Sequence, residues 1–279
     1  MPSTALHGWL VIAGKSPDGD SIRFLPDDTS LLAGLRRGER AKVNAEDGSI
    51  QLRLDGIDAP EIAYGGFGQP LGREARDRML TLAGFTELVR ERGSDAVVSA
   101  RPGRVRATAI ASVADGSGRP IALLLAGDED EGGAGLVERS LNRRLLATGA
   151  VYPMLYDSLA PELRAALRAA AAEARDARRG VWAGDVTTTG FELVDQASIG
   201  PQGALILPKL FRRCIEYLQA RLPGQTLPEW LHASAVARRP GDDGVTVAGR
   251  RTTLAGLVAQ RGTTVSLAAD PLDLVFVEG

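Results

Sequence analysis

Residues 53–61 have the sequence RLDGIDAPE, in which an apolar segment runs directly into an acidic loop. The preceding residues 49–54 alternate apolar and polar side chains, which predicts a β-strand with Arg53 on its polar face. Asp58 ends the apolar segment, and Glu61 follows three positions later, directly after a proline. The stretch therefore predicts a strand that delivers two carboxylates and an arginine to one end of a sheet.

The segments on either side continue this pattern. Residues 8–13 and 20–25 are apolar or alternating, and Pro17-Asp18-Gly19 between them predicts a hairpin turn. Downstream, Gln69-Pro70 opens a helix to about residue 83, with proline suited to the first helical turn. Further strands are predicted at residues 41–44, 85–90, 105–113 and 120–125, and helices at 136–148 and 159–179.

Two aspartates near this strand are suited to hold a hard cation. Asp20 lies at the hairpin turn and Asp58 at the strand end, and the Ala59 carbonyl offers a further oxygen. Calcium takes six to eight such oxygen ligands. Glu61 is positioned to orient or deprotonate a water molecule. These parts suffice for water attack on a phosphodiester without a covalent intermediate.

Two arginines complete the set. Arg53 lies on the strand that leads into the loop, and Arg104 belongs to another predicted strand, with Arg101 and Arg106 as neighbouring alternatives. Guanidinium groups there would stabilise the charge that develops on a pentacoordinate phosphorus. Each motif alone is more typical of a hairpin, a solvated strand or a loop. Their combination and order indicate a phosphodiesterase site.

The same segments resemble the thermonuclease family, the staphylococcal-nuclease-like proteins. Residues 18–21 resemble the family's Asp-Gly-Asp-Thr turn, and residues 53–61 resemble its Arg-x-x-x-x-Asp-x-Pro-Glu segment with identical spacing. Residues 103–104 resemble the Gly-Arg that precedes a strand, and residues 180–182 resemble the terminal Gly-Ile/Leu-Trp. The similarity covers about residues 8–184.

The resemblance implies an α+β fold, a five-stranded OB-type β-barrel with three helices. It also implies a calcium-dependent nuclease, with another divalent cation left open, that cleaves DNA and, as an open second substrate, RNA. Little sequence preference and 3′-phosphate ends are expected. The implied roles are Asp20, Asp58 and the Ala59 carbonyl as metal ligands, Glu61 as general base or water-orienting group, and Arg53 and Arg104 as the phosphate-stabilising pair.

Aromatic side chains near these segments are candidates for stacking on bases, an interaction that tolerates any sequence. Packing within the protein is the commoner role for such residues. The candidates are Tyr64, Phe67, Tyr152 and Tyr156.

A second region follows the similarity. Residues 185–190 contain three successive threonines next to a glycine and predict a linker between a nuclease domain, residues 1–184, and a smaller α+β domain, residues 191–279. A predicted helix at residues 207–222 is apolar on one side and basic on the other, where an amphipathic surface helix is favoured over a nucleic-acid-binding face. Its basic residues are Lys209, Arg212, Arg213 and Arg221. Residues 253–260 predict another helix. Targeting, assembly with itself or a protein partner, and restraint of the nuclease all remain open roles for this domain.

Composition excludes several other classes. The net charge of −2 over 279 residues means that any nucleic-acid binding depends on a local basic patch. A single cysteine, Cys214, and two distant histidines leave no thiolate or histidine metal cage. No apolar run approaches a membrane span, and no signal peptide is evident, so a cytoplasmic protein with no membrane partner is expected. Two alternatives stay open, a non-catalytic OB-type module that binds nucleic acid or protein and a nuclease subunit active only in a complex.

Overall fold

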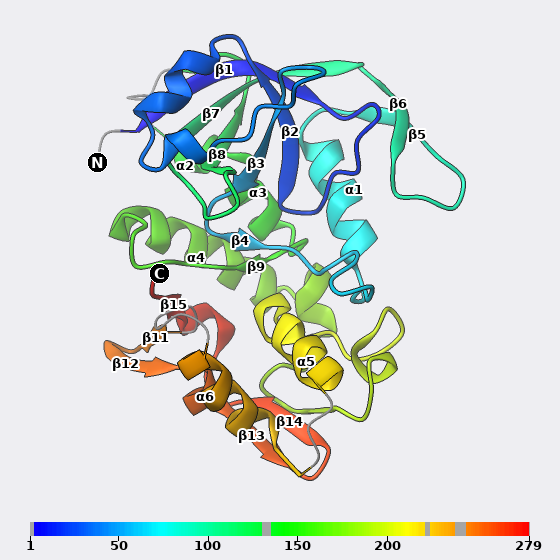
Figure 1. Ribbon diagram of the computed structural model, residues 1–279, viewed down its shortest axis with the longest axis vertical. Coiled ribbons are helices and arrows are strands. Elements are labelled where there is room, and N and C mark those ends of the chain that lie inside the picture. Colours follow the sequence, from blue (N-terminus) through cyan, green and yellow to red (C-terminus); the bar gives the residue numbers. More distant parts are fainter. Residues whose placement is uncertain (1–2, 130–134, 221–223, 238–243, 279) are drawn as a thin grey trace. The chain divides into compact units, whose positions relative to one another are not determined.

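The structure, a computed structural model, describes residues 3–129, 135–220, 224–237 and 244–278 (Figure 1). The chain forms two compact units, one of residues 1–55 and 74–145 and the other of residues 56–73 and 146–279. The division at residues 185–190 expected from the sequence stays a prediction. Within the described ranges, no helix has both the length and the apolar character that crossing a bilayer requires.

The first unit contains a closed barrel of five strands, as the sequence predicts. The strands are β1 (Thr4–Val11), β2 (Ser21–Pro26), β3 (Ile50–Leu54), β7 (Arg104–Ala114) and β8 (Pro120–Ala126). Their order around the barrel is β1-β2-β3-β8-β7, and β1 closes it by pairing antiparallel with β7. Strands β3 and β8 run parallel, whereas the other neighbours are antiparallel. The OB-type barrel and the α+β class are thus confirmed.

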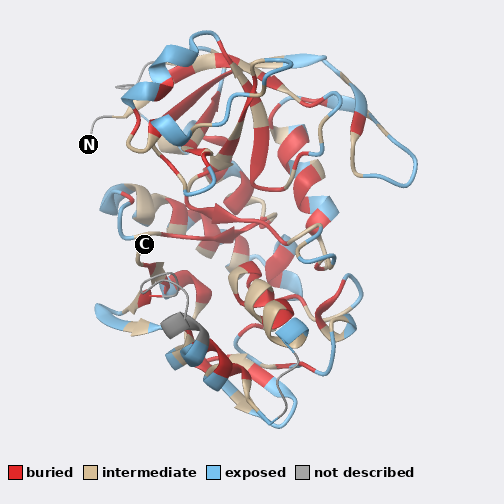
Figure 2. Cartoon of the chain, in the orientation of Figure 1, coloured by how far each residue is buried: buried red, intermediate tan, exposed pale blue. Residues whose placement is uncertain are grey.

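The barrel core follows from the alternation that the sequence shows. Ile50, Leu52 and Leu54 of β3 are buried, whereas the side chains of Gln51 and Arg53 between them are partly exposed. Buried residues likewise run along the other barrel strands (Figure 2). The buried face holds β3 in register, and this register sets the position of Arg53.

Short helices and one further hairpin lie outside the barrel. These elements are α1 (Gly72–Leu82), β5 (Thr86–Arg90), β6 (Val97–Arg101), α2 (Leu136–Arg139) and α3 (Leu141–Ala147), with 3-10 helices at Thr29–Gly34 and Gly38–Arg40. The helix predicted over residues 136–148 is interrupted at Ser140. The hydroxyl of Ser140 accepts a hydrogen bond from the backbone N–H of Arg143, which starts a new helix.

The second unit combines helices with three small sheets. Its helices are α4 (Pro161–Asp176), α5 (Pro208–Ala220), α6 (Leu227–Ala237) and α7 (Leu254–Leu257), with 3-10 helices at Gly180–Ala183, Ala197–Ile199 and Pro271–Asp273. Its strands are β4 (Ile57–Asp58), β9 (Tyr152–Pro153), β10 (Phe191–Glu192), β11 (Gly244–Val247), β12 (Arg250–Thr253), β13 (Val258–Arg261), β14 (Thr264–Leu267) and β15 (Val275–Phe276). They form the sheets β4-β9, β10-β14-β13 and β12-β11-β15.

Three sequence-based assignments are corrected. The strand predicted at residues 41–44 is wrong, because the Asn44 side chain accepts from the backbone N–H of Glu46 and forms a turn. Only Leu254–Leu257 of the helix predicted at 253–260 is helical, since β13 begins at Val258 and pairs with β14. Strand β6 is not among the strands that the sequence predicts. Its residues pair antiparallel with β5.

Candidate active site

In the first unit, Asp20 and Arg53 form an ion pair at the start of β2. Ser21 lies opposite Arg53 in the register of β2 and β3. The Arg53 guanidinium donates from Nη1 to Oδ1 of Asp20 at 2.7 Å, and the Asp20 carboxylate is 4% exposed. The backbone N–H of Leu54 also donates to the Asp20 carbonyl at 2.8 Å. The hairpin and β3 together place this predicted metal ligand and this predicted phosphate ligand side by side.

In the second unit, the acidic loop (residues 58–61) leaves β4, which pairs with β9. Its backbone is fixed by Gln69, whose side-chain oxygen accepts from the N–H of Glu61 at 3.1 Å. The backbone N–H of Gln69 donates to the Glu61 carbonyl at 2.8 Å. A Cβ at Gly72 would come within 2.6 Å of the same carbonyl, so the start of α1 requires glycine there. These contacts fix the backbone of the loop at Glu61.

The carboxylates of Asp58 and Glu61 converge on Arg212 of α5. The guanidinium donates from Nη1 to Asp58 Oδ1 at 3.1 Å and from Nη2 to Asp58 Oδ2 at 2.8 Å. It also donates from Nη1 to Glu61 Oε1 at 2.5 Å. Asp58 is fully buried, and the side chains of Glu61 and Arg212 are 15% and 19% exposed. The predicted metal ligand Asp58 and the predicted base Glu61 therefore share one positive charge.

The charge of Arg212 is fixed by this environment. Burial lowers the pKa of the guanidinium, but the charges and hydrogen bonds of Asp58 and then Glu61 outweigh it, so the pKa lies above its ordinary value. In the sequence, Arg212 belongs to the basic side of the amphipathic helix predicted at residues 207–222, with no visible link to the acidic loop. No local pattern reveals this pairing, because Arg212 and Asp58 are 154 positions apart.

Arg104 takes a different position. It is the first residue of β7, it is exposed, and its guanidinium lies over the ring of Trp9 at 4.2 Å from the centroid. The neighbouring Arg106 also lies over Trp9, at 5.3 Å, and forms ion pairs with Asp27 and Asp128. The structure thus brings together Asp20 with Arg53 and Asp58 with Glu61, whereas it places Arg104 on an indole ring.

Two of the four stacking candidates lie in the loop that follows Glu61. The Tyr64 hydroxyl donates to Glu216 of α5 at 2.5 Å, and Tyr64 and Phe67 exchange backbone hydrogen bonds of 2.6 and 3.0 Å. Burial, and next the hydrogen bond and charge of Glu216, raise the pKa of Tyr64 to about 12. Both rings are partly exposed.

The other two candidates pack inside the second unit. Tyr152 is fully buried, donates its hydroxyl to Asp185 at 2.9 Å and meets Trp182 edge-on with the ring centroids 5.2 Å apart. It presents no face to a base in this arrangement. Tyr156 packs against Phe276, with 6.0 Å between the ring centroids.

The donor atoms of the acidic loop, as arranged here, do not fit a hard divalent cation. Both oxygens of Asp58 and one of Glu61 accept from Arg212. Among the residues that the structure describes, no group of three or more His, Cys, Asp or Glu side chains is arranged to hold a metal ion. A cation that needs six or more oxygens would have to take those of Asp58 from the guanidinium.

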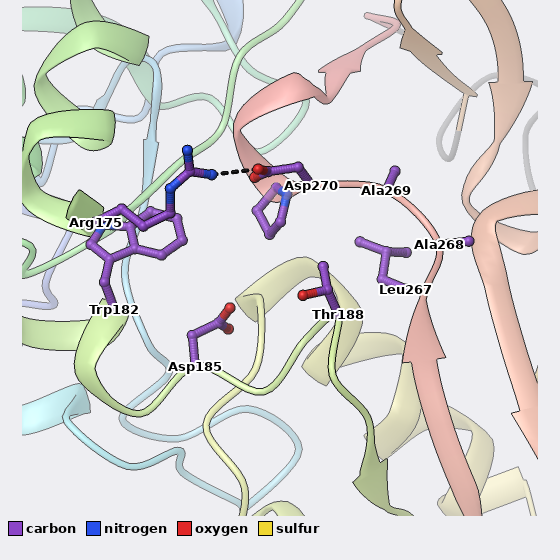
Figure 3. A pocket seen from close by; sticks show the side chains of 9 residues that line it. Arg175, Trp182, Asp185, Thr188, Leu267, Ala268, Ala269 and Asp270 are labelled. Atoms are coloured by element: carbon purple, nitrogen blue, oxygen red, sulfur yellow. Dashed lines mark hydrogen bonds and ion pairs between the residues drawn. The ribbon is translucent and has the colours of Figure 1, made fainter. Parts of the chain in front are cut away.

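A separate cavity of about 560 Å³ opens elsewhere in the second unit (Figure 3). Arg175 and Asp270 form an ion pair at its wall, and Asp185 and Thr188 project from the opposite segment. Burial raises the pKa of Asp185 above its ordinary value, and hydrogen bonds from Thr187 and Tyr152 oppose the rise. None of the predicted catalytic residues lines this cavity.

Parts of the chain are similar in sequence to one protein family and to two named proteins. Residues 51–184 match the family model described as staphylococcal nuclease homologue. A probable endonuclease LCL3 of Candida tropicalis is 35% identical over 85 residues, which cover 29% of this chain and 34% of that protein. A probable endonuclease LCL3 of Arthroderma otae is 39% identical over 62 residues, which cover 21% of this chain and 22% of that protein. The aligned parts thus span about a third or less of these relatives.

Proposed function

Because residues 51–184 match the family model described as staphylococcal nuclease homologue, we propose that this chain is a nuclease that hydrolyses phosphodiester bonds of DNA, with RNA as a second substrate. The observation that carries the proposal is the acidic loop, in which Asp58 and Glu61 converge on a single cationic group. Once released from that group, two carboxylates at a strand end would offer a ligand for a divalent cation and a base. The endonuclease names of the two relatives agree with this activity.

The proposed roles of the residues follow their chemistry. Glu61 orients the attacking water and accepts its proton, and Arg53 stabilises the charge that develops on the phosphate. Arg104, exposed on the barrel, is the second proposed phosphate ligand. Asp20, Asp58 and the Ala59 carbonyl are the proposed ligands of a divalent cation, with calcium as the proposed metal. Such an ion, when bound, supplies positive charge that favours hydroxide formation.

The proposed substrate class follows from the part of a nucleic acid that these side chains would contact. Arginines and carboxylates of this kind act on the phosphate backbone, which carries no direct sequence information. We therefore propose cleavage with little sequence preference. That the products carry 3′-phosphate ends is a proposal that rests on the family resemblance alone. Tyr64 and Phe67, which are partly exposed beside the acidic loop, are the proposed stacking residues.

Digestion of single-stranded DNA by the full chain tests this proposal. Calcium is expected to support cleavage, EDTA to stop it, and Arg53→Ala to reduce the rate at least about 100-fold, the cost of losing a charge-stabilising group. Arg78→Ala, an exposed arginine of α1, is the matched control and keeps the wild-type rate. A wild type that stays inert with every divalent cation tried would exclude the nuclease.

A non-catalytic binding module is the second candidate, and one observation favours it. The guanidinium of Arg212 takes both oxygens of Asp58, which is how a domain without a bound metal would neutralise its acids. Affinity for single-stranded DNA without cleavage, unchanged by EDTA and by Glu61→Gln, would select this candidate. Cleavage that arises only in a purified complex would indicate a subunit that needs a partner.

A further inference from the structure

We propose that helix α5 is an internal inhibitor of the acidic loop, in which Arg212 holds Asp58 and Glu61 and competes with the divalent cation for them. This inference rests on the proposed function, because it concerns the same two acids. It assigns to the C-terminal region the restraint of the nuclease. Both partners of the contact belong to the second compact unit.

The geometry of the contact with Asp58 matches the guanidinium group of an arginine. Two parallel N–H donors of the guanidinium meet the two oxygens of Asp58 at 3.1 and 2.8 Å, the bidentate geometry that lysine cannot provide. A third hydrogen bond reaches Glu61 at 2.5 Å. Asp58 is fully buried, and a buried carboxylate needs a counter-charge. Arg212 supplies that charge from within the chain.

The same face of α5 contacts the loop that follows Glu61. Glu216, one helical turn after Arg212, accepts from the Tyr64 hydroxyl at 2.5 Å, and Gln219 donates to the Gly65 carbonyl at 3.1 Å. Residues spaced by four and then three positions lie along one side of a helix. We call Arg212, Glu216 and Gln219 the α5 latch.

The fit of the latch leaves little room for another orientation of the helix. Gly65 has φ +58, and a Cβ there would lie 3.0 Å from the Gln219 side chain and 3.2 Å from that of Ile215. On the side that faces the protein, Leu210, Phe211, Cys214 and Ile215 are buried. The Gln69 side chain also donates to the carbonyl of Ile206 at 2.8 Å, just before the helix. Arg212 is thus held in place by a packed helix.

Competition follows from the shared oxygens. A cation that coordinates Asp58 needs lone pairs that the guanidinium occupies, so the bound ion and the Arg212 pair exclude one another. If the latched form outweighs the open form, the apparent affinity for the cation equals the affinity of the open form multiplied by the fraction of molecules that are open. A latch favoured about ten to one weakens binding about tenfold. Removal of the guanidinium abolishes this competition.

Calorimetric titration of the full chain with calcium chloride, without nucleic acid, tests the latch. Arg212→Gln is expected to bind calcium at least about tenfold more tightly than wild type. Lys209→Gln is the matched control, because it also removes one positive charge from α5. The ammonium group of Lys209 lies over the ring of Phe276. The Lys209→Gln variant keeps the wild-type affinity.

A second variant keeps the test informative if Arg212→Gln does not fold. Tyr64→Phe removes the hydrogen bond to Glu216, keeps Arg212, and is expected to tighten calcium binding by a smaller factor in the same direction. Equal or weaker calcium binding by folded Arg212→Gln, or no binding even at millimolar calcium, would overturn the latch. Tighter binding without cleavage of DNA would uphold the latch and reject the nuclease, so the two failures are distinguishable.

Discussion

Arg212 and Asp58, 154 positions apart in the chain, share two hydrogen bonds of 3.1 and 2.8 Å. The pair ties the C-terminal helix α5 to the acidic loop that the nuclease family model covers. A buried ion pair of this kind stabilises the fold only as long as both partners are present, because removal of one leaves the other charge buried and uncompensated.

The energetic coupling of the pair is the first prediction. Asp58→Asn is expected to lower the free energy of unfolding by about 3 kcal/mol, whereas the double variant Asp58→Asn/Arg212→Gln loses less than the sum of the two single changes. Urea denaturation measures all four proteins. Asp176→Asn, on an exposed side chain of α4, is the control and changes stability by about 0.5 kcal/mol or less. Strictly additive losses would show that the two side chains do not interact in solution.

The second prediction concerns Gly56, in the stretch that joins β3 to the acidic loop. Gly56 has φ +72, and a Cβ there would lie 2.3 Å from Cδ1 of the buried Leu167. Gly56→Ala therefore combines backbone strain with overpacking and is expected to cost about 2 to 4 kcal/mol. Gly14 has a similar φ of +70, and a Cβ there would have no atom within 4 Å. Gly14→Ala therefore measures the backbone strain alone, which is about 1 kcal/mol. Equal losses of stability in the two variants would contradict the close approach of Leu167.

The third prediction concerns the alkaline limit of stability. The pKa of Tyr64 is about 12 in the folded chain, and the ordinary value of about 10 applies to the unfolded chain. Between pH 10 and 12 the unfolded chain loses this proton first, so stability falls as the pH rises through that window and the contribution is complete below it.

Urea unfolding of wild type and Tyr64→Phe across this pH range measures the effect. The variant is expected to lose stability less steeply between pH 10 and 12. Tyr152, whose pKa burial also raises, is present in both proteins and cancels in the comparison. Parallel curves for the two proteins would mean that Tyr64 titrates normally and that its contact with Glu216 is absent.

The fourth prediction uses the single cysteine as a probe of α5. Cys214 is fully buried, and burial raises the pKa of its thiol, so the reactive thiolate is scarce. A thiol reagent is expected to react slowly with the native chain and completely after denaturation. The same protection is expected in Arg212→Gln, because the latch loses one side chain while the helix stays packed. Fast labelling of native Arg212→Gln would instead indicate that α5 detaches as a whole.

The barrel could be predicted because its signals are local. The alternation of apolar and polar residues in β3 fixes which side of the strand Arg53 occupies, and the hairpin turn places Asp20 next to it. The acidic loop also lies within one short stretch, with Glu61 three positions after Asp58, and its assignment as the active site, which depends on the combination with Asp20, Arg53 and Arg104, stays a prediction.

The remainder depends on contacts between distant segments, which local patterns do not encode. The basic side of an amphipathic helix is the same in sequence whether it faces water or an acidic loop, so the role of Arg212 could not be inferred. Tyr152 was a stacking candidate, but β9 pairs with β4, and the ring is buried there. Arg221, the last basic residue of the predicted helix, lies outside the described residues.

The rate of single-stranded DNA cleavage by Glu61→Gln, at saturating calcium and beside wild type, tests the central proposal most directly. Glu61→Gln keeps the size and polarity of the side chain and removes the base, so the rate is expected to fall at least about 100-fold. Glu74→Gln, on an exposed residue of α1, controls for the charge change and keeps the wild-type rate. Cleavage by Glu61→Gln at the wild-type rate would contradict the assignment of the acidic loop as the active site.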